Sequence, residues 1–134
     1  MSEKHVTVGK IDCGSDKLFL ISGPCVIEDE SLMMRTAERL KGISEELDIP
    51  LIFKSSFSKD NRSSLEHYQG PGIEEGLRIL EKIKSELDMP LLTDIHYPTQ
   101  AAPAAEVVDV LQIPAYLCMQ TELVVAAAKT GAVV

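Results

Sequence analysis

The chain has 134 residues, of which 45% are hydrophobic and 25% charged, and 21 acidic against 13 basic residues give a net charge of −8. This length and composition are typical of one folded domain and exclude a disordered chain. The acidic balance argues against DNA, RNA or an anionic membrane as the partner. No apolar stretch approaches the ~20 residues of a membrane span. Because the first five residues lack an apolar secretion core, we expect a cytoplasmic protein.

Short apolar runs along the chain predict β-strands. Residues 6–11 alternate weakly and precede a turn signal at residues 13–16, which predicts a small hairpin within residues 1–16, before the first main strand. The runs that follow are mostly aliphatic, as is typical of strands buried on both faces of a sheet. They are residues 18–22, 51–54, 91–94 and 107–112, and residues 132–134 have the character of one more strand beginning.

Helical patterns fill the gaps between these runs. Apolar residues recur at steps of three and four over residues 33–47 and 73–87, and shorter helices are expected near 99–106 and 121–129. Alternating strands and helices predict an α/β fold with a parallel sheet and helices outside it. Two architectures fit: an open doubly wound sheet, or part of a (β/α)8 TIM barrel, which needs roughly 250 residues when complete. In a barrel, residues 17–134 would supply the first four β/α units and the start of the fifth strand, within a single domain of residues 1–134.

A cluster of cations and hydroxyls follows the second predicted strand. Residues 53–64 contain Lys54, Lys59, Arg62 and several serines, against the single acid Asp60. In an acidic chain, this concentration of donors predicts a site for an anion such as a phosphate or a carboxylate.

Polar residues also lie at or just beyond the ends of the other predicted strands. The carboxyl ends of parallel strands share one face, where active sites form. Each residue has a structural alternative. Cys25 could be a packed thiol, Asp94 a helix cap, His96 a surface loop residue and Gln112 a partner for the backbone. Lys54, in contrast, needs a partner or a role if it ends a buried strand.

Seven short motifs carry a resemblance to a known enzyme family. They are residues 23–28 (Gly-Pro-Cys-Val-Ile-Glu), 53–64, 70–72 (Gly-Pro-Gly), 93–96 (Thr-Asp-Ile-His), 112–115, 120–121 and 128–132. Over about residues 6–134 the chain resembles the N-terminal half of the 3-deoxy-D-manno-octulosonate 8-phosphate synthases. Its Lys-x-Asn-Arg-Ser-Ser element, residues 59–64, is the most specific of these motifs.

The resemblance implies a transferase with a TIM-barrel fold, usually a homotetramer. Such an enzyme condenses phosphoenolpyruvate with arabinose 5-phosphate and releases phosphate, and its eight-carbon product feeds lipopolysaccharide synthesis. The implied phosphoenolpyruvate contacts are Lys54, Ser56, Lys59 and Gln112. The implied groups around arabinose 5-phosphate are Lys59, Asn61, Arg62, Ser63, Asp94 and His96, with Arg62 and Ser63 at its phosphate. Among these, Lys54, Lys59, Asp94 and His96 are expected to be the catalytic residues.

Cysteine at position 25 resembles the metal-dependent class of this family, since the metal-independent class has asparagine there. The resemblance implies that the Cys25 thiolate is one ligand of a divalent ion, Zn, Fe, Mn or Co. The ion would orient or polarise the sugar aldehyde and an attacking water. The other ligands, a His, a Glu and an Asp, are expected beyond residue 134. Met119 stands where relatives commonly have an arginine that reaches the sugar phosphate of a neighbouring subunit, a contact that methionine cannot make.

Two other functions remain open from the sequence. The first is a non-catalytic or vestigial half barrel that binds a sugar phosphate, which would follow from the metal ligands missing from this chain. The second is the related synthase that uses erythrose 4-phosphate to make a 3-deoxy-heptulosonate phosphate. Those synthases share Gly-Pro-Cys but typically carry Lys-Pro-Arg-Thr where this chain has Lys-Ser-Ser-Phe at residues 54–57.

Overall fold

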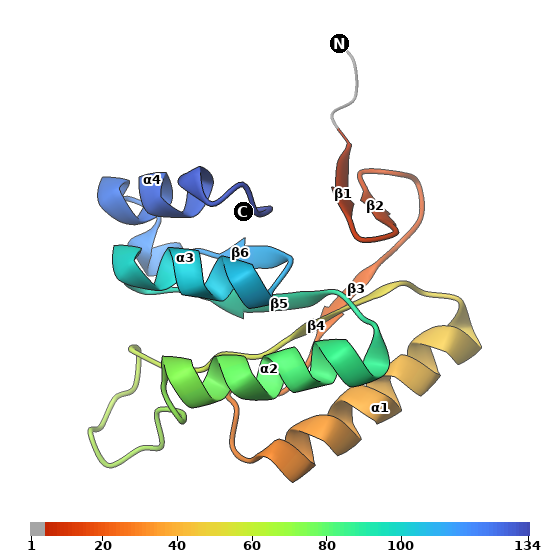
Figure 1. The fold of residues 1–134 in the computed structure, drawn as a ribbon, viewed down its shortest axis with the longest axis horizontal. Helices are drawn as coiled ribbons and strands as arrows, with labels where there is room; N and C mark the ends of the chain where they lie inside the picture. The colour runs from red at the N-terminus through yellow and green to blue at the C-terminus, as the bar shows by residue number, and fades with distance from the viewer. Residues whose placement is uncertain (1–4) are drawn as a thin grey trace.

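In the computed structural model, which describes residues 5–134, a hairpin leads into a parallel sheet (Figure 1). Strands β1 (Val6–Val8) and β2 (Ile11–Cys13) pair antiparallel, with Val6 opposite Cys13. Gly9 adopts φ +58° in the turn between them, a left-handed conformation that glycine reaches without strain. The pairing is the hairpin that the alternating sequence predicts, although residues 1–4 of that segment lie outside the described residues.

The main sheet has four parallel strands in the order in which they occur along the chain. These strands are β3 (Leu20–Ser22), β4 (Leu51–Lys54), β5 (Leu91–Asp94) and β6 (Val110–Gln112). Beyond β6, Val133 forms a parallel bridge with Val110, and its carbonyl accepts a hydrogen bond from the Leu111 N–H at 2.8 Å. The α/β class with a parallel sheet is therefore confirmed.

Two predicted strand boundaries are wrong. The first strand begins at Leu20 instead of residue 18, and Leu18 is 81% exposed. The fourth begins at Val110 instead of residue 107, because Val107 is the last residue of a helix. Asp109 lies between the end of this helix and the start of β6, inside the apolar run. Its carboxylate accepts the Leu91 N–H at 2.8 Å and so anchors the start of the neighbouring strand β5.

Four α-helices follow the strands of the main sheet. They are α1 (Glu30–Leu47), α2 (Ile73–Leu87), α3 (Pro98–Val107) and α4 (Thr121–Lys129), with a short 3-10 turn, η1 (Ala115–Leu117), before the last one. The first helix begins three residues earlier than predicted because the Asp29 side chain accepts the Leu32 N–H at 2.8 Å and caps it. Each helix contacts the next one along the chain (Figure 1). No helix in residues 5–134 is long and apolar enough to cross a membrane.

The two faces of the sheet are buried by different parts of the chain. Phe53, Leu91 and Leu111 belong to the main core with residues of the four helices. On the other face, Ile52 and Leu92 form a small cluster with Val8 and Ile11 of the hairpin. Strand β3 departs from this pattern, since Leu20 is 41% and Ile21 47% exposed. The prediction that every strand is buried on both faces is therefore wrong for β3, an edge strand with a neighbour on one side only.

Lysines join the carboxyl ends of successive helices. Lys41 of α1 donates from Nζ to the carbonyl oxygen of Leu87, the last residue of α2, at 2.6 Å. Lys84 of α2 donates in the same way to the carbonyl oxygen of Val107, the last residue of α3, at 2.9 Å. A cation at a helix carboxyl end both satisfies an unpaired carbonyl and complements the helix dipole.

Gly23, just after β3, lies against the last residue of β4. A Cβ at this position would fall 1.9 Å from the carbonyl oxygen of Lys54. We expect Gly23→Ala to lower the free energy of unfolding in urea by about 2 kcal/mol, because the two strand ends would have to separate. Gly42 in α1 is the matched control, since a Cβ there meets nothing within 4 Å. Gly42→Ala should raise stability by up to about 1 kcal/mol. A neutral Gly23→Ala would contradict the close approach.

Candidate functional site

A connected polar network lies at the carboxyl ends of β4 and β5. Lys54 ends β4, Asp94 ends β5, and Ser56 is fully buried between them. The Ser56 hydroxyl donates to Oδ1 of Asp94. It also accepts from Lys59 Nζ at 2.7 Å and from Lys54 Nζ at 3.2 Å. Two ammonium groups therefore converge on one hydroxyl, and Lys54 Nζ lies 3.7 Å from Asp94 Oδ1.

Burial and charge act against each other in this network. Burial alone would raise the pKa of Asp94, but hydrogen bonds from His96 and Ser56 and the charges of Lys54 and Lys59 lower it to about 2. Burial lowers the pKa of Lys54, Asp94 opposes this change, and the charge of Lys59 lowers the pKa further. Asp94 is therefore ionised at neutral pH. When both lysines are charged, one carboxylate faces two ammonium groups, and the excess positive charge favours an anion.

His96 is held on several sides beside this network. Its side chain is 3% exposed, and Nε2 lies 3.0 Å from Oδ2 of Asp94. The Phe57 ring lies against it with the ring centroids 6.5 Å apart, and its backbone N–H donates to the Gln100 side chain at 2.8 Å. The other ring nitrogen, Nδ1, is buried and makes no hydrogen bond in the described part of the chain, but lies 3.4 Å from Oδ2 of Asp60.

Asp60 is a member of the site that sequence reasoning missed. In the sequence this residue counts only as the one acid within a run of cations. Its side chain is 30% exposed, and it reaches His96 from the loop that follows β4. No periodicity or strand-end rule applies to such a loop, so only the three-dimensional structure brings Asp60 to the imidazole ring.

The remaining predicted sugar-site residues lie outside the network. Asn61, Arg62 and Ser63 are exposed on the loop after β4, and Arg62 donates from Nε to the backbone oxygen of Tyr68 at 3.1 Å. The structure therefore gathers Lys54, Ser56, Lys59, Asp94 and His96, and leaves these three on the loop surface.

Gln112 and Cys25 lie on the rim of the same end of the sheet. Gln112 stands opposite Asp94 in the strand register, and its carbonyl oxygen accepts the Ile95 N–H at 3.0 Å while its side chain is exposed. Cys25 is exposed, which makes the packed-thiol alternative wrong. Within residues 5–134, no three His, Cys, Asp or Glu side chains gather so that they could hold a metal ion. These residues therefore do not form a complete metal site.

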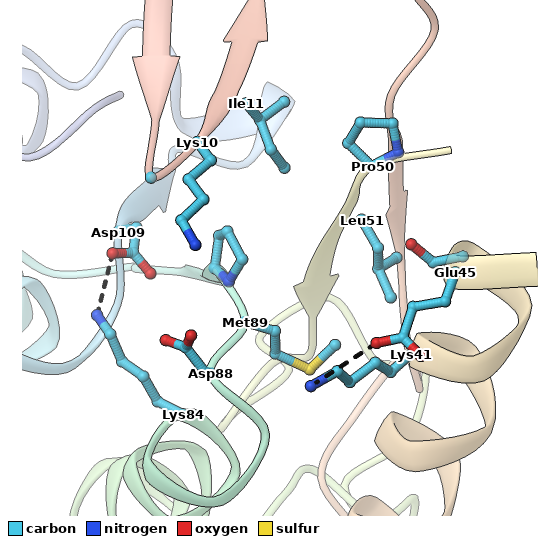
Figure 2. Close-up of a pocket in the computed structure, with 13 residues that line it drawn as sticks. Lys10, Ile11, Lys41, Glu45, Pro50, Leu51, Lys84, Asp88, Met89 and Asp109 are labelled. Carbon is cyan, nitrogen blue, oxygen red and sulfur yellow. Dashed lines mark hydrogen bonds and ion pairs between the residues drawn. The ribbon is translucent and has the colours of Figure 1, made fainter. Parts of the chain in front are cut away.

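A pocket lies at the opposite end of the sheet from this network. It has a volume of about 310 Å³ and lies under the hairpin turn, near the starts of β4 and β5. Figure 2 shows the residues that line it. Several of its polar groups already serve the fold, because Lys84 pairs with Asp109 at 3.0 Å and Lys41 caps α2. In parallel α/β folds ligands bind at the carboxyl ends of the strands, so the network around Ser56 is the better candidate site.

This fold and site define a class: an α/β domain with lysines, a carboxylate and a histidine at the carboxyl ends of parallel strands. The chain belongs to the DAHP synthetase I family, whose model matches residues 2–134.

Relatives within curated proteins carry a more specific name. The chain is 58% identical over 132 residues to the 2-dehydro-3-deoxyphosphooctonate aldolase of Trichlorobacter lovleyi, covering 98% of this chain and 48% of that protein. It is 55% identical over 127 residues to the enzyme of the same name from Koribacter versatilis, covering 95% and 46%. For that of Shewanella halifaxensis the identity is 52% over 135 residues, covering 100% and 48%. The family resemblance drawn from the motifs is confirmed, and the chain spans about half the length of these relatives.

Proposed function

We propose that this chain supplies the substrate-binding part of a 3-deoxy-D-manno-octulosonate 8-phosphate synthase. Such an enzyme joins phosphoenolpyruvate to arabinose 5-phosphate and releases phosphate. The observation that carries the proposal is the convergence of Lys54 and Lys59 on Ser56 and Asp94. Relatives at 52–58% identity, named 2-dehydro-3-deoxyphosphooctonate aldolase, favour this function over the use of erythrose 4-phosphate.

The phosphoenolpyruvate end of the proposed site consists of Lys54, Ser56, Lys59 and Gln112. Phosphoenolpyruvate carries a carboxylate and a phosphate, so it needs cations and donors fixed in place before it binds. The two lysine ammonium groups are oriented by one buried hydroxyl and partly withdrawn from water, which strengthens their attraction for an anion. Gln112 would donate its side-chain amide from the rim of β6.

The sugar end of the proposed site lies between the buried histidine and the exposed loop. Asp94 and His96 would contact the sugar near the reacting aldehyde, and Lys59 would stand between the two substrates. Asn61, Arg62 and Ser63 would bind the sugar phosphate from the loop, where their exposure leaves them open to a ligand. Holding two anions side by side in this way offsets their mutual repulsion and brings the reacting carbons together.

The order of the strands supports half of a TIM barrel in preference to a doubly wound sheet. Strands β3 to β6 follow chain order, and successive helices contact one another. A doubly wound sheet reverses its strand order at a switch point instead. The remaining strands would come from protein outside residues 1–134 and would pair with the open edge of β3. A homotetramer, as the family resemblance implies, is part of the same proposal.

Metal dependence also belongs to the proposal. Cys25 would provide one thiolate ligand for Zn, Fe, Mn or Co, and its other ligands would come from outside residues 1–134. The described residues do not complete a metal site by themselves, so the proposal needs these further ligands.

Phosphate release from phosphoenolpyruvate tests the function. The purified chain is assayed with arabinose 5-phosphate or erythrose 4-phosphate, each with added Zn²⁺ or with a chelator, and phosphoenolpyruvate binding is measured by calorimetry. Turnover with arabinose 5-phosphate but not with erythrose 4-phosphate supports the proposed synthase. Loss of that turnover with the chelator supports the proposed metal dependence. Binding of phosphoenolpyruvate without turnover would support this chain as the substrate-binding part of the enzyme, and absence of that binding would contradict the proposed function.

A further inference from the structure

Several contacts hold His96 in place, and the proposed function does not explain one of them, the contact with Asp60. Asp94 contacts Nε2, Phe57 lies against the ring, and Gln100 holds the backbone. The remaining polar atom, Nδ1, is buried and faces the Asp60 carboxylate at 3.4 Å.

The state of Asp94 determines what Nδ1 can do. Asp94 is a carboxylate, because its pKa lies at about 2, and a carboxylate only accepts hydrogen bonds. Nε2 of His96 must therefore carry a hydrogen to bond Asp94 at 3.0 Å. If the ring were neutral, Nδ1 would then present a lone pair to the Asp60 carboxylate, and the two acceptors would repel each other. In the charged ring both nitrogens donate, and each faces a carboxylate.

We propose that Asp60 is a positioning residue that holds His96 as a doubly protonated ring between two carboxylates. The inference rests on the proposed function only for what His96 does to a bound sugar. The charges around the ring include Asp94 and Asp60 on its two nitrogens, with Lys54 and Lys59 beyond Asp94. The two lysines disfavour a further positive charge on the ring. The single negative charge of Asp94 does not offset both lysines and a charged ring, and Asp60 supplies a second negative charge.

Such a ring has a defined role at the sugar end of the site. A charged imidazole remains a hydrogen-bond donor and a positive charge, and it does not act as a base. Asp60, with its side chain 30% exposed, couples this state to the loop that carries Asn61, Arg62 and Ser63.

The direct test is nitrogen NMR of ¹⁵N-histidine-labelled chain at pH 6.5, comparing wild type with Asp60→Asn. The ratio of doubly protonated to neutral His96 should fall about fivefold, because a carboxylate within 4 Å is removed from a partly exposed pair. Asp12→Asn is the matched control: it removes the same charge from a histidine contact, the 2.9 Å pair with His5 in the hairpin. That variant should change the His5 signals and leave His96 unaltered. The ring signals are assigned with His96→Asn.

Asp60→Glu and kinetics complete the test. Glutamate keeps the charge and should restore the wild-type ratio at His96. In the phosphate-release assay, Asp60→Asn should lower kcat more than it raises KM for phosphoenolpyruvate, with a changed pH profile that Asp60→Glu restores. An unchanged ratio at His96 in Asp60→Asn overturns the inference. The NMR result needs no turnover, so a chain that shows the fivefold change but does not bind phosphoenolpyruvate would contradict the proposed function and leave the role of Asp60 intact.

Discussion

Replacing Asp94 with alanine is expected to lower the free energy of unfolding by about 4 kcal/mol, since it removes one partner from a buried, charged network. Its two carboxylate oxygens accept from Ser56 and His96 and lie near Lys54. Without them, two ammonium groups face each other over Ser56 with no negative charge between them. Urea denaturation at pH 7 measures the effect. Asp12→Ala, which removes an exposed carboxylate from the hairpin, should cost less than about 1 kcal/mol.

The same carboxylate makes stability depend on pH. Its pKa falls from 3.8 to about 2 on folding, so its contribution is fully present above about pH 4 and is lost as the pH falls toward 2. This pKa difference between the unfolded and folded states corresponds to about 2 kcal/mol of stability at neutral pH. Wild type should therefore lose more stability than Asp94→Ala between pH 4 and 2. Parallel pH profiles for the two proteins would show that Asp94 is not held ionised by the network.

Lys54→Met is expected to weaken phosphoenolpyruvate binding about a hundredfold, which corresponds to one charge-assisted hydrogen bond to the ligand. The methionine keeps most of the length of the side chain and removes the charge. Stability should change little, because burial already disfavours the charged lysine and Lys59 stays close to Ser56. Calorimetry measures the affinity, and urea denaturation checks the fold.

Lys10→Met is the matched control for that experiment. Lys10 lines the pocket at the opposite end of the sheet, so the net charge changes equally while the proposed site stays intact (Figure 2). The affinity of the Lys10→Met variant for phosphoenolpyruvate should remain within about twofold of wild type, since separated surface charges are screened by salt. Equal losses in both variants would mean that net charge, and not the site around Ser56, governs binding.

Much of the fold follows from patterns that act locally. The steps of three and four over residues 73–87 match α2, and the short aliphatic runs at 51–54 and 91–94 match β4 and β5. The boundary near Val107 fails because an aliphatic residue fits the end of a helix as well as the start of a strand. The exposure of Leu20 and Ile21 could not be predicted either, because burial of an edge strand depends on what pairs with it.

The candidate site also has a part that the sequence predicts and a part that it does not. Lys54, Asp94 and the residues near them could be brought together in advance, because parallel strands deliver their carboxyl ends to one face. The contact between Asp60 and His96 depends on the path of a loop of irregular structure, for which the sequence offers no periodicity. The roles of the exposed loop residues, Asn61 to Ser63, stay predictions that the binding experiments address.

The lysines at the helix ends have a consequence for how the helical layer unfolds. Lys41 belongs to α1 but completes the end of α2, and Lys84 belongs to α2 but completes the end of α3. When one helix unravels, it withdraws the lysine on which the next helix depends. We therefore expect fraying to propagate along the row, so that α1, α2 and α3 exchange their amide protons with solvent as one cooperative unit.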